Sequence, residues 1–197
     1  MNDLKLFISN IVFLVNILLL ISKSAFAEDF DDNYVQVTTG LGKILGKRLK
    51  IEQLNSQVDQ FLGIPYAQPP INENRFHRPK PIIDNYEQQP FMAIDWPPNC
   101  RQINVPKFNE YSTYSNQTFQ EDCLYLNIWS PVDIVPHLND DQCDRINCNN
   151  NNQQKLRPVF VYIHGGCFLY GGSSLPIYDG KIFAAMTDAL IVTLNFR

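Results

Sequence analysis

The chain has 197 residues, of which 16 are Lys or Arg and 20 are Asp or Glu, so its formal net charge is −4 at pH 7. Proteins that bind nucleic acids present strongly basic surfaces, and this balance therefore argues against a nucleic-acid partner. Hydrophobic residues make up 45% of the chain, which agrees with a globular protein.

The first 27 residues are predicted to be a secretory signal peptide. The apolar run Leu6–Ser22 is followed by Ala25-Phe26-Ala27, an A-x-A site of the kind that signal peptidase cleaves. A membrane anchor is the alternative, but two asparagines interrupt the run and the cleavage site follows it directly. We therefore expect a secreted, extracellular chain that begins at Glu28. No later apolar run is long enough to span a bilayer.

Two segments near the start are predicted to form an antiparallel hairpin. Tyr34–Leu45 and Ile51–Ile64 have the composition of strands, with glycines and polar turn residues around them. Further along, residues 137–155 are almost wholly polar and low in complexity, which is typical of a solvated insertion.

Three later segments are predicted to be strands of a central sheet: Leu124–Trp129, Pro158–Ile163 and Leu190–Asn195. The last two are nearly continuous in apolar character, which predicts burial on both faces. A helix over Asp179–Ala189 would connect them, giving a strand, crossover and parallel strand. We expect the sheet to end on Leu190–Asn195, where an unpaired edge would favour aggregation.

The most informative motif is PVFVYIHGGCF at Pro158–Phe168, where an apolar strand runs into two glycines. Gly165 and Gly166 leave backbone N–H groups accessible and permit positive φ. Backbone N–H groups aimed at the oxygen of an attacked carbonyl form an oxyanion hole, and lipases and esterases build one with an HGGG-type motif. Cys167 stands in place of the third glycine. Taken alone, the motif could also be a tight turn with no catalytic role.

Other motifs carry a family resemblance. FLGIPYAQPP at Phe61–Pro70, EDCLYLNIWSP at Glu121–Pro131 and IVTLNFR at Ile191–Arg197 occur in order along the chain. With the glycine motif, they resemble the type-B carboxylesterase family, which includes cholinesterases and neuroligin-like adhesion proteins. The resemblance implies that residues 28–197 are the N-terminal, incomplete portion of an α/β-hydrolase fold, with antiparallel N-terminal strands leading into a mostly parallel central sheet.

The nucleophile of that family is expected outside this sequence. It is a serine in a G-x-S-x-G elbow, followed along the chain by an acid and a histidine. No G-x-S-x-G occurs here, and the resemblance places the elbow beyond Arg197. The pair Ser173-Ser174 lacks the glycine spacing and is predicted to lie in a flexible loop. We therefore expect an N-terminal part that carries the oxyanion-hole loop but not the catalytic triad.

The resemblance assigns the oxyanion donors to the backbone N–H groups of Gly166 and Cys167, with Gly165 shaping the turn. Cys167 keeps its own N–H but brings a sulfur beside the acyl pocket, where thiol reagents would block the site. The alternative is a packed, inert side chain, because free cysteines are often buried. His164 is predicted to be structural, since the resemblance places the triad histidine far downstream. Cofactors and metals are not expected, because the cysteines lack CxxC spacing and the histidines are scattered.

The resemblance also assigns structural pairs. It places a disulfide between Cys100 and Cys123, which would stabilise the protein by about 3 kcal/mol in a chain-entropy model. Cys143 and Cys148 could form a local pair, although spacing alone does not establish connectivity.

Two further features surround the first disulfide. Arg75 and Glu121 are expected to form an internal salt bridge, and loss of one partner from a buried pair would cost several kcal/mol. The only glycosylation sequon begins at Asn116, inside the loop between the two cysteines, and a glycan there is expected to lie in solvent.

The substrate expectation is a small-molecule carboxylic ester. Cholinesterases hold choline against a tryptophan in the loop between the two cysteines, but this loop has none, and Thr113 stands where the resemblance would put it. A broad carboxylic ester hydrolase is therefore favoured over a dedicated choline esterase. The competing hypothesis is an inactive, neuroligin-like adhesion ectodomain that binds partner proteins, since fold alone does not decide function.

Overall fold

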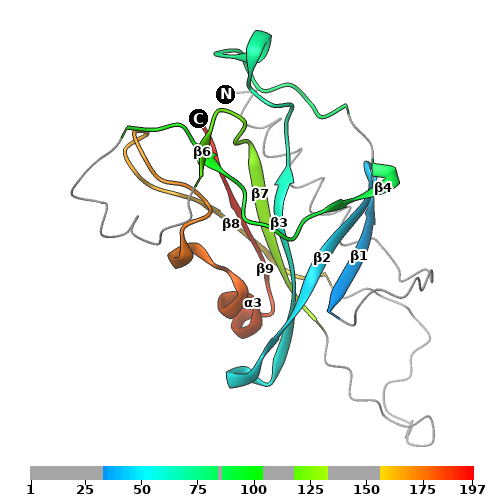
Figure 1. Cartoon of the computed structure of the whole chain (residues 1–197). Coiled ribbons are helices and arrows are strands. Elements are labelled where there is room, and N and C mark those ends of the chain that lie inside the picture. Colours follow the sequence, from blue (N-terminus) through cyan, green and yellow to red (C-terminus); the bar gives the residue numbers. More distant parts are fainter. Residues whose placement is uncertain (1–32, 84–85, 104–117, 133–155) are drawn as a thin grey trace, which may run out of the picture.

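The computed structural model describes residues 33–83, 86–103, 118–132 and 156–197, which form a twisted sheet with one short helix against it (Figure 1). The seven strands of this sheet are β1 (Tyr34–Thr39), β2 (Gly42–Ile51), β3 (Ser56–Pro65), β4 (Tyr86–Met92), β7 (Tyr125–Pro131), β8 (Val159–Ile163) and β9 (Leu190–Leu194). A separate two-stranded sheet pairs β5 (Asn99–Cys100) with β6 (Phe119–Gln120). The helix is α3 (Lys181–Thr187), and short 3-10 turns cover η1 (Glu52–Leu54), η2 (Asn72–Asn74) and η5 (Pro176–Tyr178).

The strand order in the main sheet is β1-β2-β3-β7-β9-β8, with β4 beside β2. All neighbours from β1 to β9 are antiparallel, whereas β8 and β9 run parallel, from Val159 opposite Leu190 to Ile163 opposite Leu194. The predicted crossover unit is therefore present. Among the described strands, the parallel pairs are β8 with β9, β4 with β2 and the short β5 with β6. Each of these pairs is joined by a long connection, as parallel pairing requires.

In place of the predicted single hairpin, the three strands β1, β2 and β3 form two consecutive hairpins. The first turn follows Thr39, whose hydroxyl donates to the Gly42 carbonyl at 3.0 Å and accepts from the Leu41 N–H at 3.1 Å. The second turn closes through η1 and ends at Asn55, which has a left-handed φ of 44°. The side-chain hydrogen bonds of Thr39 stabilise a local turn within Tyr34–Leu45, which we predicted as one arm of a single hairpin.

Buried side chains lie on both faces of the sheet, as the period of two along each strand requires. One cluster contains Phe61, Leu126 and Val192, and the other contains Trp129 and Ile191 with Ala184 of α3. The helix approaches this second face closely at Gly180, where an added Cβ would lie 2.7 Å from the Trp129 ring. Glycine thus allows the helix start to contact the sheet.

The burial of β8 differs from the prediction. Every residue of β9 is buried because β9 lies between β7 and β8. In contrast, β8 is the edge of the described sheet, and Phe160 and Ile163 are 49% and 57% exposed. The prediction that the sheet ends on Leu190–Asn195 was wrong, since the later strand inserts between two earlier ones.

Residues 28–197 expressed alone are expected to associate rather than fold as a stable monomer, because β8 offers unpaired backbone groups and apolar side chains. Size-exclusion chromatography with light scattering and thermal unfolding would test this expectation. Phe160→Lys should reduce association, whereas Gln36→Lys on β1, which is exposed, should not. A monomer that melts cooperatively would refute the prediction.

Candidate active site

The glycine motif forms a tight turn immediately after β8. Its backbone takes positive φ at Gly166 (132°), Cys167 (55°), Phe168 (59°) and Gly171 (116°). Inside the turn, the N–H groups of Leu169 and Tyr170 donate to the Gly166 carbonyl at 2.9 and 3.2 Å. Two consecutive non-glycine residues in the left-handed region cost about 1–2 kcal/mol each, so the surrounding structure must impose this conformation.

The first two glycines of the motif have different surroundings. An added Cβ on Gly166 would clash with the Tyr170 carbonyl, so this glycine is needed by the turn itself. An added Cβ on Gly165 would meet none of the described atoms within 4 Å, and Gly165 is exposed. Within the described part of the chain, the N–H groups of Gly166 and Cys167 donate no hydrogen bond. The turn therefore carries two adjacent N–H groups that are unpaired among the described residues, next to the exposed Gly165.

His164 packs between the glycine turn and Phe196. It is 8% exposed, its ring stacks on Phe196 with centroids 4.6 Å apart, and its Nδ1 lies 2.9 Å from the Gly165 carbonyl oxygen. Burial lowers the pKa of His164, and the contact with Gly165 opposes this shift only in part. The imidazole is therefore neutral at physiological pH, and its Nδ1 bears the hydrogen that Gly165 accepts. These contacts are those of a structural residue.

The segment after the turn is buried, contrary to the prediction of a flexible loop. Ser173 is 1% exposed, and its N–H donates to the Asn195 side chain at 2.8 Å. Asn195 in turn donates to the Pro98 carbonyl at 2.9 Å. Asn127 of β7 donates to the Ser173 hydroxyl at 3.3 Å. The two asparagine amides thus attach this segment to the sheet.

Both the oxygen and the nitrogen of the Asn127 side-chain amide are hydrogen-bonded in the core. Its oxygen accepts from the Gly63 N–H at 2.9 Å, and its nitrogen also donates to the Thr193 hydroxyl at 3.0 Å. Asn127 and Asn195 are both fully buried. Our sequence reasoning missed them, although a lone asparagine in each of the apolar segments LYLNIW and IVTLNF was a visible signal.

The disulfide between Cys100 and Cys123 is present, with a Cα–Cα distance of 4.9 Å. Most of the loop that it closes, including Asn116 and Thr113, lies outside the described residues. So do residues 1–32, the polar segment at 137–155, Cys143 and Cys148.

Cys167 is a free and exposed cysteine, which contradicts the alternative of a packed, inert side chain.

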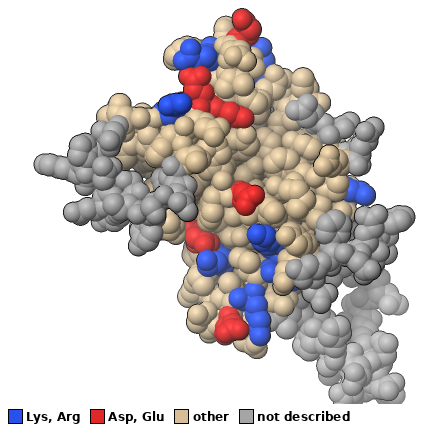
Figure 2. Space-filling view, viewed as in Figure 1, with Lys and Arg blue, Asp and Glu red and all other residues tan. Residues whose placement is uncertain are grey.

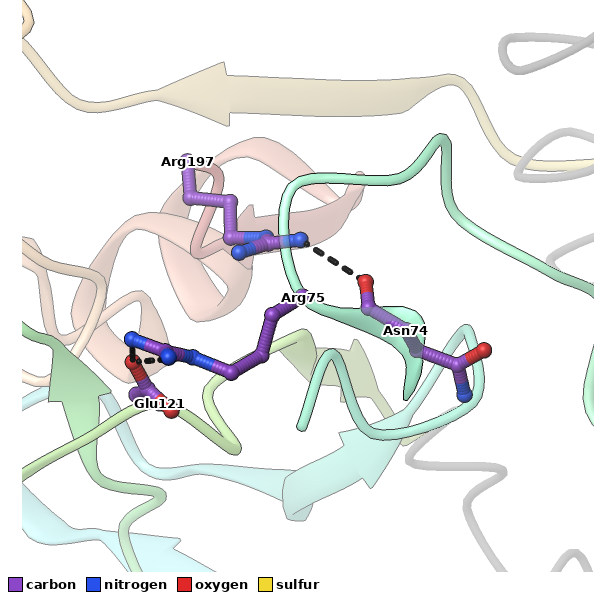
Figure 3. Close-up of polar contacts among 4 residues, drawn as sticks. All are labelled: Asn74, Arg75, Glu121 and Arg197. Atoms are coloured by element: carbon purple, nitrogen blue, oxygen red, sulfur yellow. Dashed lines mark hydrogen bonds and ion pairs between the residues drawn. The ribbon is translucent and has the colours of Figure 1, made fainter. Parts of the chain in front are cut away.

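Arg75 and Glu121 form an ion pair, shown in Figure 3 with the neighbouring contact of Arg197 to the Asn74 carbonyl. Nε and Nη2 of Arg75 lie 3.0 and 2.7 Å from the same Glu121 oxygen. The two side chains are 48% and 38% exposed, so the expectation of a buried pair was wrong. Solvent screens such a pair, which limits its contribution to stability.

Comparisons with known proteins identify the family. The model described as "Carboxylesterase family" matches residues 32–197. The chain belongs to the carboxylesterase family. It is 36% identical to the cholinesterase of Mus musculus, over 94% of this chain and 27% of that protein. It is 35% identical to the acetylcholinesterase of Electrophorus electricus, over 84% of this chain and 24% of that protein. It is 33% identical to the liver carboxylesterase of Sus scrofa, over 82% of this chain and 26% of that protein.

Membership of the carboxylesterase family confirms the predicted resemblance and the fold class, an N-terminal portion of the α/β-hydrolase fold. It also supports ester-hydrolase chemistry in general terms. The chain spans about a quarter of the length of the relatives named above.

The described residues bear on two other kinds of site, a membrane span and a metal site. They contain no helix that is long and apolar enough to cross a bilayer and no group of three acidic, His or Cys side chains placed to hold a metal ion. In Figure 2, charged side chains gather toward two ends of the viewed face, with a broad, largely uncharged band between them. The absence of a nucleic-acid partner stays a prediction.

Two substitutions compare how much the buried amide network and the exposed ion pair contribute to the free energy of unfolding. Asn127→Ala is expected to lower the free energy of unfolding by at least about 2 kcal/mol, because it leaves several buried polar groups unpaired. Glu121→Ala should lower it by less than about 1 kcal/mol, because the pair is solvent-screened. Urea unfolding of both variants, made in the full-length protein and not in residues 28–197 alone, would measure the difference, and equal losses would contradict this assignment.

Proposed function

We propose that this chain supplies the oxyanion hole of a secreted carboxylic ester hydrolase whose serine nucleophile follows Arg197. The observation that carries the proposal is the pair of unpaired N–H groups of Gly166 and Cys167, on a turn with open space beside Gly165. Donors held in this way do not need to reorganise when a carbonyl oxygen becomes an anion. The carboxylesterase membership supports the same chemistry.

The proposed reaction is acyl transfer through a covalent intermediate. The serine oxygen attacks the ester carbonyl carbon while a histidine, oriented by an acid, takes the hydroxyl proton. The negative charge that develops on the carbonyl oxygen is stabilised by the two N–H groups. The histidine then gives its proton to the departing alcohol, and a water molecule hydrolyses the acyl-enzyme by the same steps.

The proposed substrates are small carboxylic esters in general, without a dedicated site for choline. No tryptophan occurs between Cys100 and Cys123, so the loop has no indole face for a quaternary ammonium group. Relatives named cholinesterase and relatives named carboxylesterase are similarly close, at 36% and 33% identity, so identity alone does not choose between these substrates.

The test begins with the coding sequence that follows Arg197. We expect a G-x-S-x-G elbow there, and expect the protein that includes it to hydrolyse p-nitrophenyl acetate and butyrate. Replacing the elbow serine with alanine should abolish turnover. A natural replacement of that serine, together with an inactive protein, would refute the hydrolase and favour the adhesion ectodomain.

Cys167 should make this hydrolase sensitive to thiol reagents. Its side chain is exposed on the turn that carries the oxyanion donors, so an adduct on its sulfur would obstruct the acyl group. N-ethylmaleimide should inhibit ester hydrolysis more strongly than the smaller methyl methanethiosulfonate. Cys167→Gly should remove both effects, and glycine also suits the positive φ. Equal inhibition of Cys167→Gly and the parent enzyme would show that another thiol is responsible.

A further inference from the structure

Gln102 connects the disulfide to the exit of the glycine turn. It lies two residues after Cys100, and its side-chain nitrogen donates to the Cys100 carbonyl at 3.0 Å. The same nitrogen donates to the Gly171 carbonyl at 2.8 Å, and the side-chain oxygen accepts from the Gly171 N–H at 2.8 Å. One amide therefore pairs with both backbone groups of Gly171, as a neighbouring strand would.

Gly171 transmits this constraint to the turn. An added Cβ at Gly171 would lie 2.5 Å from the Gly165 carbonyl oxygen and 2.6 Å from Nδ1 of His164. The backbone of Gly171 thus packs directly against the residue that opens the turn and against the histidine beneath it. A shift of Gly171 would displace Gly165 or His164, because the space between them is already filled.

At neutral pH, glutamine and asparagine are the side chains suited to pair with both the N–H and the C=O of one residue. The carboxamide carries a donor and an acceptor side by side, whereas a carboxylate only accepts and an ammonium only donates. Gln102 is half-buried, so its hydrogen bonds compete less with water than those of an exposed side chain.

We propose that Gln102 is a positioning residue that couples the Cys100–Cys123 disulfide loop to the oxyanion turn. It acts on the N–H groups of Gly166 and Cys167 through Gly171 and touches no reacting atom. This inference rests on the proposed hydrolase function and deepens it: the disulfide does more than hold the chain together, because it anchors the residue that fixes the turn.

The first experiment compares Gln102→Met with the parent enzyme in the protein that contains the elbow. Methionine has a similar length, but it has no N–H to donate to the Gly171 carbonyl and no carbonyl oxygen to accept from the Gly171 N–H. A misplacement of about 1 Å can cost about 100-fold in rate, so we expect kcat to fall by about 10- to 100-fold. KM should change by less than about threefold. Gln53→Met, at an exposed position in η1, is the matched control and should leave both constants unchanged.

Inhibitor binding distinguishes positioning from a loss of folded protein. A trifluoromethyl ketone forms a tetrahedral adduct that uses the oxyanion hole, so its affinity should fall by the same factor as kcat/KM. A neutral competitive ligand should bind Gln102→Met and the parent enzyme equally. Rates are expressed per active site titrated, so a poorly folded fraction does not lower kcat.

A second variant gives a pH signature. The carboxylate of Gln102→Glu cannot donate to the Gly171 carbonyl, whereas its protonated form has one O–H that can. The kcat of Gln102→Glu relative to the parent enzyme should therefore rise as the pH falls toward about 5. A residue with a merely structural role would give a constant ratio.

Three results would overturn the inference: an unchanged kcat per site in Gln102→Met, equal losses in affinity for both inhibitors, or a pH-independent ratio for Gln102→Glu. An inactive parent enzyme would instead refute the proposed function. In that case, hydrogen exchange at residues 165–171 still tests the coupling, since it should accelerate in Gln102→Met and not in Gln53→Met.

Discussion

The glycine turn depends on how the segment that follows it, Gly171–Ser174, is attached to the sheet. The turn itself is strained, with Cys167 and Phe168 both in the left-handed region. Its internal hydrogen bonds go to a single carbonyl, that of Gly166, and they do not fix the turn relative to β8. The attachment comes from outside, through side-chain amides that bind the exit segment.

Asparagine suits this task because an amide can bind backbone and side-chain groups at the same time. Asn127 lies opposite Thr193 in the pairing of β7 with β9, and its amide joins that pair to Ser173 and to the backbone of Gly63. A buried polar group is costly when it is unpaired, but a fully bonded one orders its neighbours. Several of the buried polar residues therefore lie where the segment after the glycine turn crosses the core: Asn127, Ser173, Thr193 and Asn195.

The parallel pairing of β8 with β9 brings together the residues that follow each strand. Because the strands run in the same direction, the residues that follow them emerge at the same edge of the sheet. His164 follows β8 and Phe196 follows shortly after β9, and their rings stack. The edge position of β8 leaves the turn accessible, whereas β9 beside it is buried and holds Phe196 in place.

Much of this protein was determined by local sequence. The apolar runs predicted β7, β8, β9 and the helix between the last two to within a few residues, because strand and helix periodicities are local properties. The motif at Gly165 and Gly166 predicted the turn, since a strand followed by two glycines has few conformations open to it. The family motifs predicted the Cys100–Cys123 pairing, which no spacing rule would have given.

Only the tertiary structure decided the neighbours and the burial of these elements. The position of β9 between β7 and β8, the burial of Ser173 and the exposure of Arg75 and Glu121 all depend on residues far away in the sequence. A polar residue in isolation predicts solvent exposure, and its hydrogen-bond partners become visible only once distant strands are placed side by side. For the same reason Gln102 carried no signal in the sequence: its partner, Gly171, is 69 residues away.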